Sequence, residues 1–181
     1  MRKGFLKIWL LLICILITGC SSVPISSMLK MATMDDSDIT ALEPAQIRTR
    51  ITVDAPTELQ TKNVRLVLRF EFYQQTESEY EFLLKMVDNQ SVTQEKGWFS
   101  GATMRNEYTF ELLEESIAEF KKYQRDFFKY GKPRKYYWTV YYYLGKRPPP
   151  DQSVELDLEL KLADHEPYFY LLQGAALGVS P

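Results

Sequence analysis

The sequence predicts a mainly β protein, an antiparallel β-sandwich of six or seven strands with one amphipathic helix at about residues 113–130. The prediction rests on two observations. Several segments alternate apolar and polar residues with the period of two that is typical of half-buried strands. One later segment repeats its apolar residues every three or four positions instead. The alternative is an α+β layer, one curved sheet with the helix packed across it, because both arrangements leave one face of each strand in water.

Four strands are predicted in the first half of the domain, at residues 46–54, 64–73, 79–87 and 104–110. The second is the clearest, because its apolar residues share one face and its charged residues share the other. A short polar break separates it from the third, and this spacing predicts a hairpin. Asp88-Asn89 has the chemistry of a turn and is expected to follow the third strand.

The helix is predicted from apolar residues at helical spacing, namely Leu113, Ile117, Phe120, Tyr123, Phe127 and Tyr130. Acidic residues lie early in this segment and basic residues late, which complements the helix dipole. Gly131 and Pro133 then provide a stop signal. Three further strands are predicted, at residues 135–144, 154–162 and 167–172.

The N-terminus begins with a basic stretch and continues with apolar residues only, from Ile8 to Ile17. As a helix, this run would reach ~15 Å at ~1.5 Å per residue. A bilayer has a hydrocarbon core ~30 Å thick, so the run is too short to cross it. A basic start followed by a short apolar run is typical of a secretory signal peptide.

The apolar run ends in Ile17-Thr18-Gly19-Cys20, an aliphatic residue and two small residues before a cysteine. This motif resembles the lipobox of bacterial lipoproteins. The resemblance implies that the Cys20 thiol is acylated and that signal peptidase cuts just before it. A single acyl chain binds a protein to a bilayer only weakly and reversibly, whereas two or three chains give a stable anchor. The protein is therefore expected to be attached to a membrane surface without crossing the bilayer. Ser21 and Ser22 imply, by the same resemblance, the periplasmic face of the outer membrane.

The expected organisation is therefore a signal peptide at residues 1–19, a lipidated tether at 20–45 and a single β-rich domain at 46–181. Removal of the signal peptide takes away three basic residues, which makes the net charge of −2 more negative, so nucleic-acid binding is not expected. Cys14 is removed and Cys20 is lipidated, which leaves no thiol for a disulfide, a nucleophile or a zinc site. No cofactor and no metal are expected.

Two residues carry side chains that could act in catalysis. His165 lies between Asp164 and Glu166, where it could serve as a general base, but the pattern favours a turn just before Pro167. Ser100 lies in a glycine-flanked stretch whose spacing does not match a nucleophile elbow. The sequence therefore predicts no catalytic residue, and a hydrolase is the weakest of the functions considered.

The segment KYYWTVYYYL, residues 135–144, is aromatic on both faces of its predicted strand. Tyr and Trp are enriched at protein interfaces, so one of these faces is a candidate interaction surface. The alternative is that one face fills the core and the other packs under the helix. The candidate interaction residues are Tyr137, Trp138, Tyr141 and Tyr143.

These observations favour a non-catalytic cell-envelope lipoprotein that acts as a structural or assembly module in the periplasm. Its expected partners are the membrane, through the lipid anchor, and an envelope protein, through a sheet edge or an aromatic face. The alternative is a module that binds a lipid, a glycan or a peptidoglycan fragment in a pocket between sheet and helix.

Overall fold

The computed structural model describes residues 22–72, 77–96, 100–126, 133–146 and 153–177. The predicted signal peptide, Cys20 and residues 127–130 of the predicted helix lie outside these ranges. All seven predicted strands are present. They are β1 (Arg48–Asp54), β2 (Glu58–Glu71), β3 (Glu77–Lys96), β4 (Ser100–Leu112), β5 (Lys135–Lys146), β6 (Val154–Lys161) and β7 (Phe169–Leu177).

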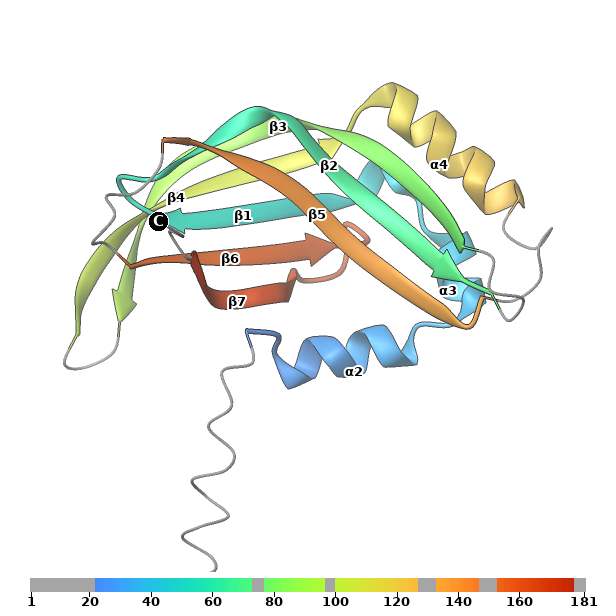
Figure 1. The fold of residues 1–181 in the computed structure, drawn as a ribbon, viewed down its shortest axis with the longest axis horizontal. Helices are drawn as coiled ribbons and strands as arrows, with labels where there is room; N and C mark the ends of the chain where they lie inside the picture. The colour runs from blue at the N-terminus through green and yellow to red at the C-terminus, as the bar shows by residue number, and fades with distance from the viewer. Residues whose placement is uncertain (1–21, 73–76, 97–99, 127–132, 147–152, 178–181) are drawn as a thin grey trace, which may run out of the picture.

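The strands form a single antiparallel sheet in the order β5-β2-β3-β4-β1-β6-β7, strongly curled along its length (Figure 1). The prediction of a mainly β, antiparallel fold with a helix against the sheet is confirmed. Of the two arrangements considered, the single curved sheet is the one observed, and the two-sheet sandwich is corrected. Alternation could not separate them, because the two halves of a curled sheet face one another much as two sheets do.

The curl has a visible cause in β3, which is long enough to belong to both halves of the sheet. β3 pairs with β2 through Glu77–Leu83 and then with β4 through Leu84–Lys96. The register shifts between Met86 and Asp88, and such a bulge increases local twist and bends a strand. Asp88-Asn89 is therefore part of β3 and not the predicted turn. β2 carries a second irregularity between Gln60 and Arg65, opposite β5.

The core fills the concave side of this sheet. Its strand residues come from the predicted apolar faces, and the most buried include Ile51, Val53, Leu66, Phe70, Phe82, Phe110, Leu156 and Leu160. The predicted helix is α4 (Glu114–Asp126) and packs across one end of the sheet. Its Phe120 ring lies 5.0 Å from that of Phe82 on β3, and its Tyr123 ring stacks on that of Phe70 on β2 at 5.2 Å.

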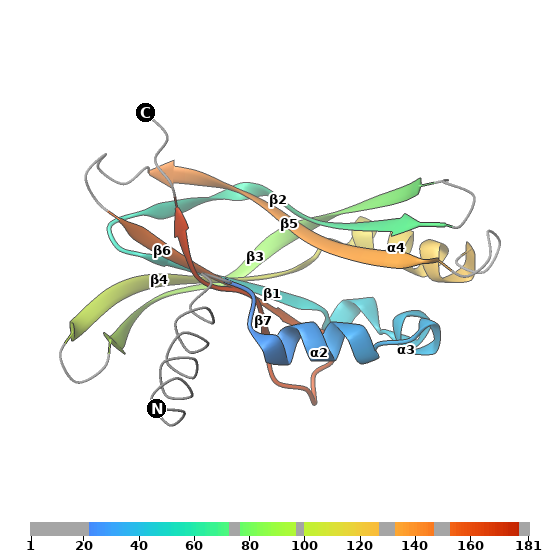
Figure 2. The same ribbon diagram turned by 60° about the horizontal axis from the view of Figure 1, so that its bottom comes forward.

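Residues 24–46, most of the expected tether, form two short helices and a 3-10 turn against the domain. They are α2 (Ile25–Thr33), α3 (Asp36–Ala41) and η1 (Pro44–Gln46). α2 lies beside β7, and α3 continues toward α4 (Figure 2). Ile39 of α3 is fully buried and belongs to the core. This part of the chain therefore contributes to the packing of the fold.

Hydrogen bonds attach this helical segment to both outer strands of the sheet. At its start, the backbone N–H of Gln173 on β7 donates to the carbonyl of Ser22 at 2.6 Å. Farther along, the hydroxyl of Tyr136 on β5 hydrogen-bonds to Asp36 of α3. We call residues 22–42 the strap, because they span from β7 to β5 across the open side of the core.

Candidate functional site

β5 presents two aromatic faces, as its alternation predicts, and the sheet assigns them different surroundings. Trp138 lies on the face toward the core, where it packs against buried residues while remaining partly exposed. Tyr137, Tyr141 and Tyr143 lie on the opposite face. Tyr141 is 46% exposed and Tyr143 is 47% exposed. Of the four candidate interaction residues, Trp138 therefore lies against the core, and the three tyrosines share the outer surface of β5.

The surface formed by Tyr137, Tyr141 and Tyr143 is held in place by charged residues of β2. The guanidinium of Arg69 lies 4.7 Å from the ring centre of Tyr137, and that of Arg65 lies 4.9 Å from that of Tyr141. Such contacts attract a cation to the face of an aromatic ring. They restrain the rings of Tyr137 and Tyr141.

Glu71 fixes the end of this surface near the start of β5. The hydroxyl of Tyr137 donates to Glu71 Oε1 at 2.9 Å, and Arg134 Nη2 donates to Glu71 Oε2 at 3.2 Å. These hydrogen bonds stabilise the ionised form of the carboxyl and lower the pKa of Glu71, with the Tyr137 hydroxyl as the larger cause. The hydroxyl of Tyr137 is therefore used within the protein, whereas the side chains of Tyr141 and Tyr143 are more exposed to solvent.

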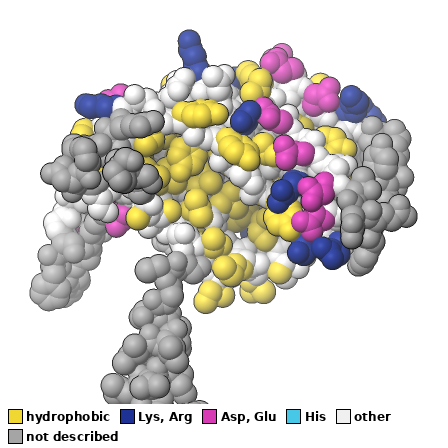
Figure 3. All heavy atoms as spheres, viewed as in Figure 1, with side chains coloured by type: hydrophobic (Ala, Val, Ile, Leu, Met, Phe, Trp, Pro, Cys, Tyr) yellow, Lys and Arg dark blue, Asp and Glu magenta, His cyan; other side chains and the backbone are white. Residues whose placement is uncertain are grey.

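β5 is also an outer strand of the sheet, since it pairs with β2 on one side and ends the strand order. The other outer strand, β7, is in a different situation. Ser22 accepts from its Gln173 N–H, and Lys30 of α2 lies 5.0 Å from the ring centre of its Phe169. The strap thus covers part of β7. Hydrophobic side chains are visible on the molecular surface between the two outer strands (Figure 3).

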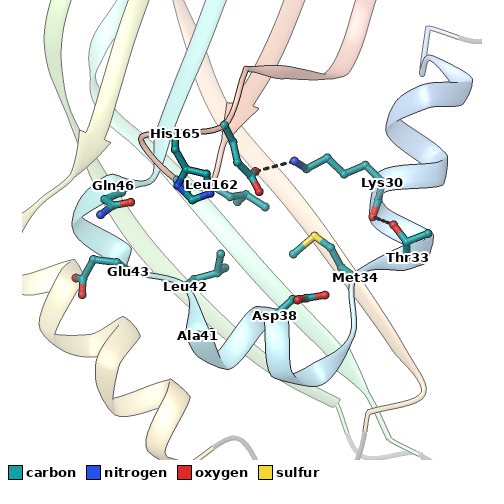
Figure 4. Close-up of a pocket in the computed structure, with 12 residues that line it drawn as sticks. Lys30, Thr33, Met34, Asp38, Ala41, Leu42, Glu43, Gln46, Leu162 and His165 are labelled. Atoms are coloured by element: carbon teal, nitrogen blue, oxygen red, sulfur yellow. Dashed lines mark hydrogen bonds and ion pairs between the residues drawn. The ribbon is translucent and has the colours of Figure 1, made fainter.

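A hollow of about 670 Å³ lies between the strap and the turn that joins β6 to β7 (Figure 4). Met34, Leu42 and Leu162 supply its apolar lining. Its rim is charged, and Lys30 Nζ lies 2.7 Å from Glu166 Oε2 across one side. A second hollow of about 410 Å³ lies on the other side of Met34, between the strap and the start of β5, where Trp138 contributes to its wall.

His165 is exposed in the turn between β6 and β7 and lines the larger hollow. Its position agrees with the turn predicted before Pro167. Within the described ranges, no group of three or more His, Cys, Asp or Glu residues is arranged to hold a metal ion.

A buried charged cluster was missed by the sequence analysis. Arg105 on β4 is 2% exposed and lies between Asp54 of β1 and Asp157 of β6. Arg105 Nε is 2.8 Å from Asp54 Oδ1, and Asp157 accepts from the backbone N–H of Gly174 at 2.6 Å. Gly174 has a φ of +59°, in the left-handed region that glycine adopts without strain. Alternation would place these residues on the wet face, and nothing in the sequence indicates that they are buried.

Comparison of the chain with protein-family models, with curated proteins and with solved structures finds no match. Among the described residues, no helix is long and apolar enough to cross a membrane. The functional argument therefore starts from the geometry above and from the N-terminal motif.

Proposed function

We propose that this chain is a non-catalytic lipoprotein of the cell envelope, anchored through acylated Cys20 on the periplasmic face of the outer membrane. We further propose that it binds an extended segment of an envelope protein along β5. The anchor is supported by the basic start, the short apolar run and the sequence Ile17-Thr18-Gly19-Cys20. The binding surface is supported by the outer position of β5 together with the exposure of Tyr141 and Tyr143.

The single observation that carries the binding proposal is the contrast between the two outer strands. Both strands end the strand order, but β7 is partly covered by the strap, whereas β5 exposes aromatic side chains. Proteins commonly blunt such strands with charges, prolines or a covering segment, because a free edge pairs readily with another chain. An edge that is kept long and aromatic is suited to strand addition by a partner.

In this mode of recognition the backbone of the partner supplies hydrogen bonds, and alternate side chains supply specificity. The side chains of Tyr141 and Tyr143 would contact the residues of the added strand that face the same way. Arg65 lies beside the ring of Tyr141 and Arg69 beside that of Tyr137, and these cations favour acidic or polar groups among the contacted residues. The proposed partner is therefore an extended segment that alternates apolar and acidic or polar residues.

The binding proposal is tested by placing a photo-crosslinking amino acid at Thr139, which is exposed between the candidate tyrosines, in intact cells. We expect specific crosslinks to envelope proteins, and loss of these crosslinks when Tyr141→Lys and Tyr143→Lys are combined. The matched control combines Met104→Lys with Val87→Lys, which introduces the same two charges at exposed apolar positions on β4 and β3. Unchanged crosslinks in the double variant would rule out a role for this surface.

The anchor is tested separately with Cys20→Ser. We expect the variant to lose palmitate labelling, to retain its signal peptide and to fail to yield the processed membrane-bound form. A Cys20→Ser protein that still has the processed mass and stays with membranes would contradict lipidation.

The alternative function, a module for a lipid, glycan or peptidoglycan fragment, is favoured by one observation, the hollow beside the strap. Its volume suits a small ligand, and Met34, Leu42 and Leu162 offer apolar contacts. Leu42→Trp would fill this space. If the protein retains an envelope fragment on purification, we expect the variant to lose it, while crosslinking through Thr139 is unchanged.

A further inference from the structure

The apolar residues of α2 gather on one side of the helix, and most of them are exposed rather than packed against the domain. Ser27 is buried, and Met34, just after the helix, packs against the core. On the opposite side, the residues at helical spacing point into solvent. We call these four residues, Ile25, Met28, Leu29 and Ala32, the outward stripe.

The outward stripe is unusually exposed for apolar side chains of this size. Ile25 is 83% exposed, Leu29 is 64% exposed and Met28 is 49% exposed. Hydrophobic side chains are also visible along the lower rim of the molecule, over α2 (Figure 3). Scattered exposed apolar residues are common on protein surfaces, but a continuous stripe on one helix indicates that something covers it.

The position of the stripe in the chain indicates what covers it. Only five peptide units separate Cys20 from Ile25, and a fully extended chain gains at most ~3.5 Å per residue, so Ile25 lies within roughly 17 Å of the Cys20 backbone. If Cys20 is acylated, its backbone sits at the membrane surface. The hydrogen bond from Gln173 to Ser22 fixes part of this short connection to β7 and so limits the orientations of the domain.

We propose that the outward stripe of α2 is buried in the interfacial layer of the membrane, so that α2 lies on the bilayer and orients the domain. This inference rests on the proposed lipidation of Cys20. An amphipathic helix in this position places its apolar face ~5–10 Å into the boundary between headgroups and acyl chains. The acyl anchor keeps α2 close to the membrane surface, so insertion of the stripe is an intramolecular step. For this reason a stripe of a few residues is enough to bind the helix to the bilayer.

The charges of the strap indicate how α2 is tilted. Asp35, Asp36 and Asp38 follow the helix, about 15 Å beyond Ile25 at ~1.5 Å per residue. Acidic residues are unfavourable in the interfacial layer of an anionic membrane, so this end remains in water. Lys30, whose ammonium could otherwise meet lipid phosphates, is paired with Glu166. Insertion is therefore expected to be deepest at Ile25 and Leu29.

The test uses tryptophan fluorescence of the processed, lipidated protein in phosphatidylcholine vesicles, with and without bromine atoms on the acyl chains. Leu29→Trp places the probe in the stripe, and Ala118→Trp places it at an exposed position of α4 as the matched control. Each variant is compared with the unsubstituted protein to subtract its native tryptophans. We expect Leu29→Trp to give blue-shifted emission and to lose intensity with brominated chains, and Ala118→Trp to show neither effect.

Ile25→Trp provides a second probe in the stripe and guards against a local effect at residue 29. If both stripe variants behave like Ala118→Trp while the protein sediments with the vesicles, the inference is overturned although lipidation stands. A blue shift without bromine quenching also overturns it, because protein would then cover the stripe. A processed protein that carries no acyl chain and does not sediment with vesicles would overturn the proposed anchor, and this inference with it.

Discussion

Arg105 and Asp54 occupy directly opposed positions on β4 and β1 and form an ion pair that is closed to solvent, with 2.8 Å between Arg105 Nε and Asp54 Oδ1. Asp157 on β6 also pairs with Arg105, and the guanidinium donates further to the carbonyl oxygens of Thr52 and Glu155. Arg105 thus joins three neighbouring strands. The cluster carries one positive and two negative side chains, so its balance depends on the arginine.

Replacement of Arg105 by Met is expected to lower the free energy of unfolding by about 3–5 kcal/mol, because it leaves two buried carboxylates without their counter-charge. The measurement is urea unfolding followed by near-ultraviolet circular dichroism. Lys122→Met is the control, since its pair with Glu119 is exposed and should contribute less than about 0.5 kcal/mol. Equal effects of the two substitutions would mean that the cluster does not stabilise the sheet.

Phe120 is fully buried and joins α4 to β3 through the ring of Phe82. Phe120→Ala should lower the free energy of unfolding by about 3–5 kcal/mol, through lost burial and the cavity that remains. Val87→Ala, at an exposed position on β3, should change it by no more than about 0.5 kcal/mol. A small effect of Phe120→Ala in thermal or urea unfolding would show that α4 is not essential to the core.

Gln124 of α4 closes the C-terminal end of α3. Its side-chain amide donates to the carbonyl oxygens of Ile39, Thr40 and Leu42, at 3.3, 3.1 and 2.7 Å. Gln124→Ala should leave these carbonyls short of donors and cost about 1–3 kcal/mol, with faster amide hydrogen exchange in residues 36–42. Gln90→Ala removes an exposed amide and should leave the exchange unchanged. Unaltered exchange in Gln124→Ala would mean that Ile39 and the Tyr136–Asp36 hydrogen bond hold α3 without Gln124.

Glu159 gives a prediction for pH dependence. Burial raises its pKa, and the neighbouring Arg50 opposes this only in part. The folded state therefore takes up the proton more readily than the unfolded state, so the contribution of Glu159 to stability falls as the pH rises from the unfolded value of ~4.3 through the folded pKa. Glu159→Gln should be more stable than the parent at pH 7 and equal to it below pH ~4.

The measurement for Glu159 is urea unfolding of both proteins across this pH range. Glu119→Gln is the control, because Glu119 is exposed on α4 and should show no such pH-dependent difference. A Glu159→Gln protein that is less stable at pH 7 would mean that the attraction to Arg50 outweighs the cost of burial.

The sequence located the strands because each keeps one apolar face, as β6 does from Val154 to Leu160. It did not specify their order, because periodicity shows which face is buried but not which strand lies alongside. The end of β3 was missed for a related reason. Residues beyond Met86 are largely polar and exposed, so β3 continues there as a strand without an alternating pattern.

The candidate surface on β5 was predictable in part. Alternation correctly separated Trp138 from Tyr137, Tyr141 and Tyr143, but which of the faces meets solvent depends on pairing with β2. The strap was not predictable as helix, because α2 has only nine residues and its pattern covers little more than two turns. Its apolar residues nevertheless share one side of the helix, which the structure leaves largely exposed.

The unequal outer strands also bear on self-association. If both outer strands of a sheet are free to pair, copies can join edge to edge into a filament, because each added copy brings another unpaired outer strand. Here Ser22 accepts a hydrogen bond from Gln173 on β7, while within the described residues no strand pairs with the outer edge of β5. Two copies that pair through β5 would form a two-fold dimer, with a strap-covered β7 at each outer end of the joined sheet. Association through the outer strands would therefore stop at the dimer.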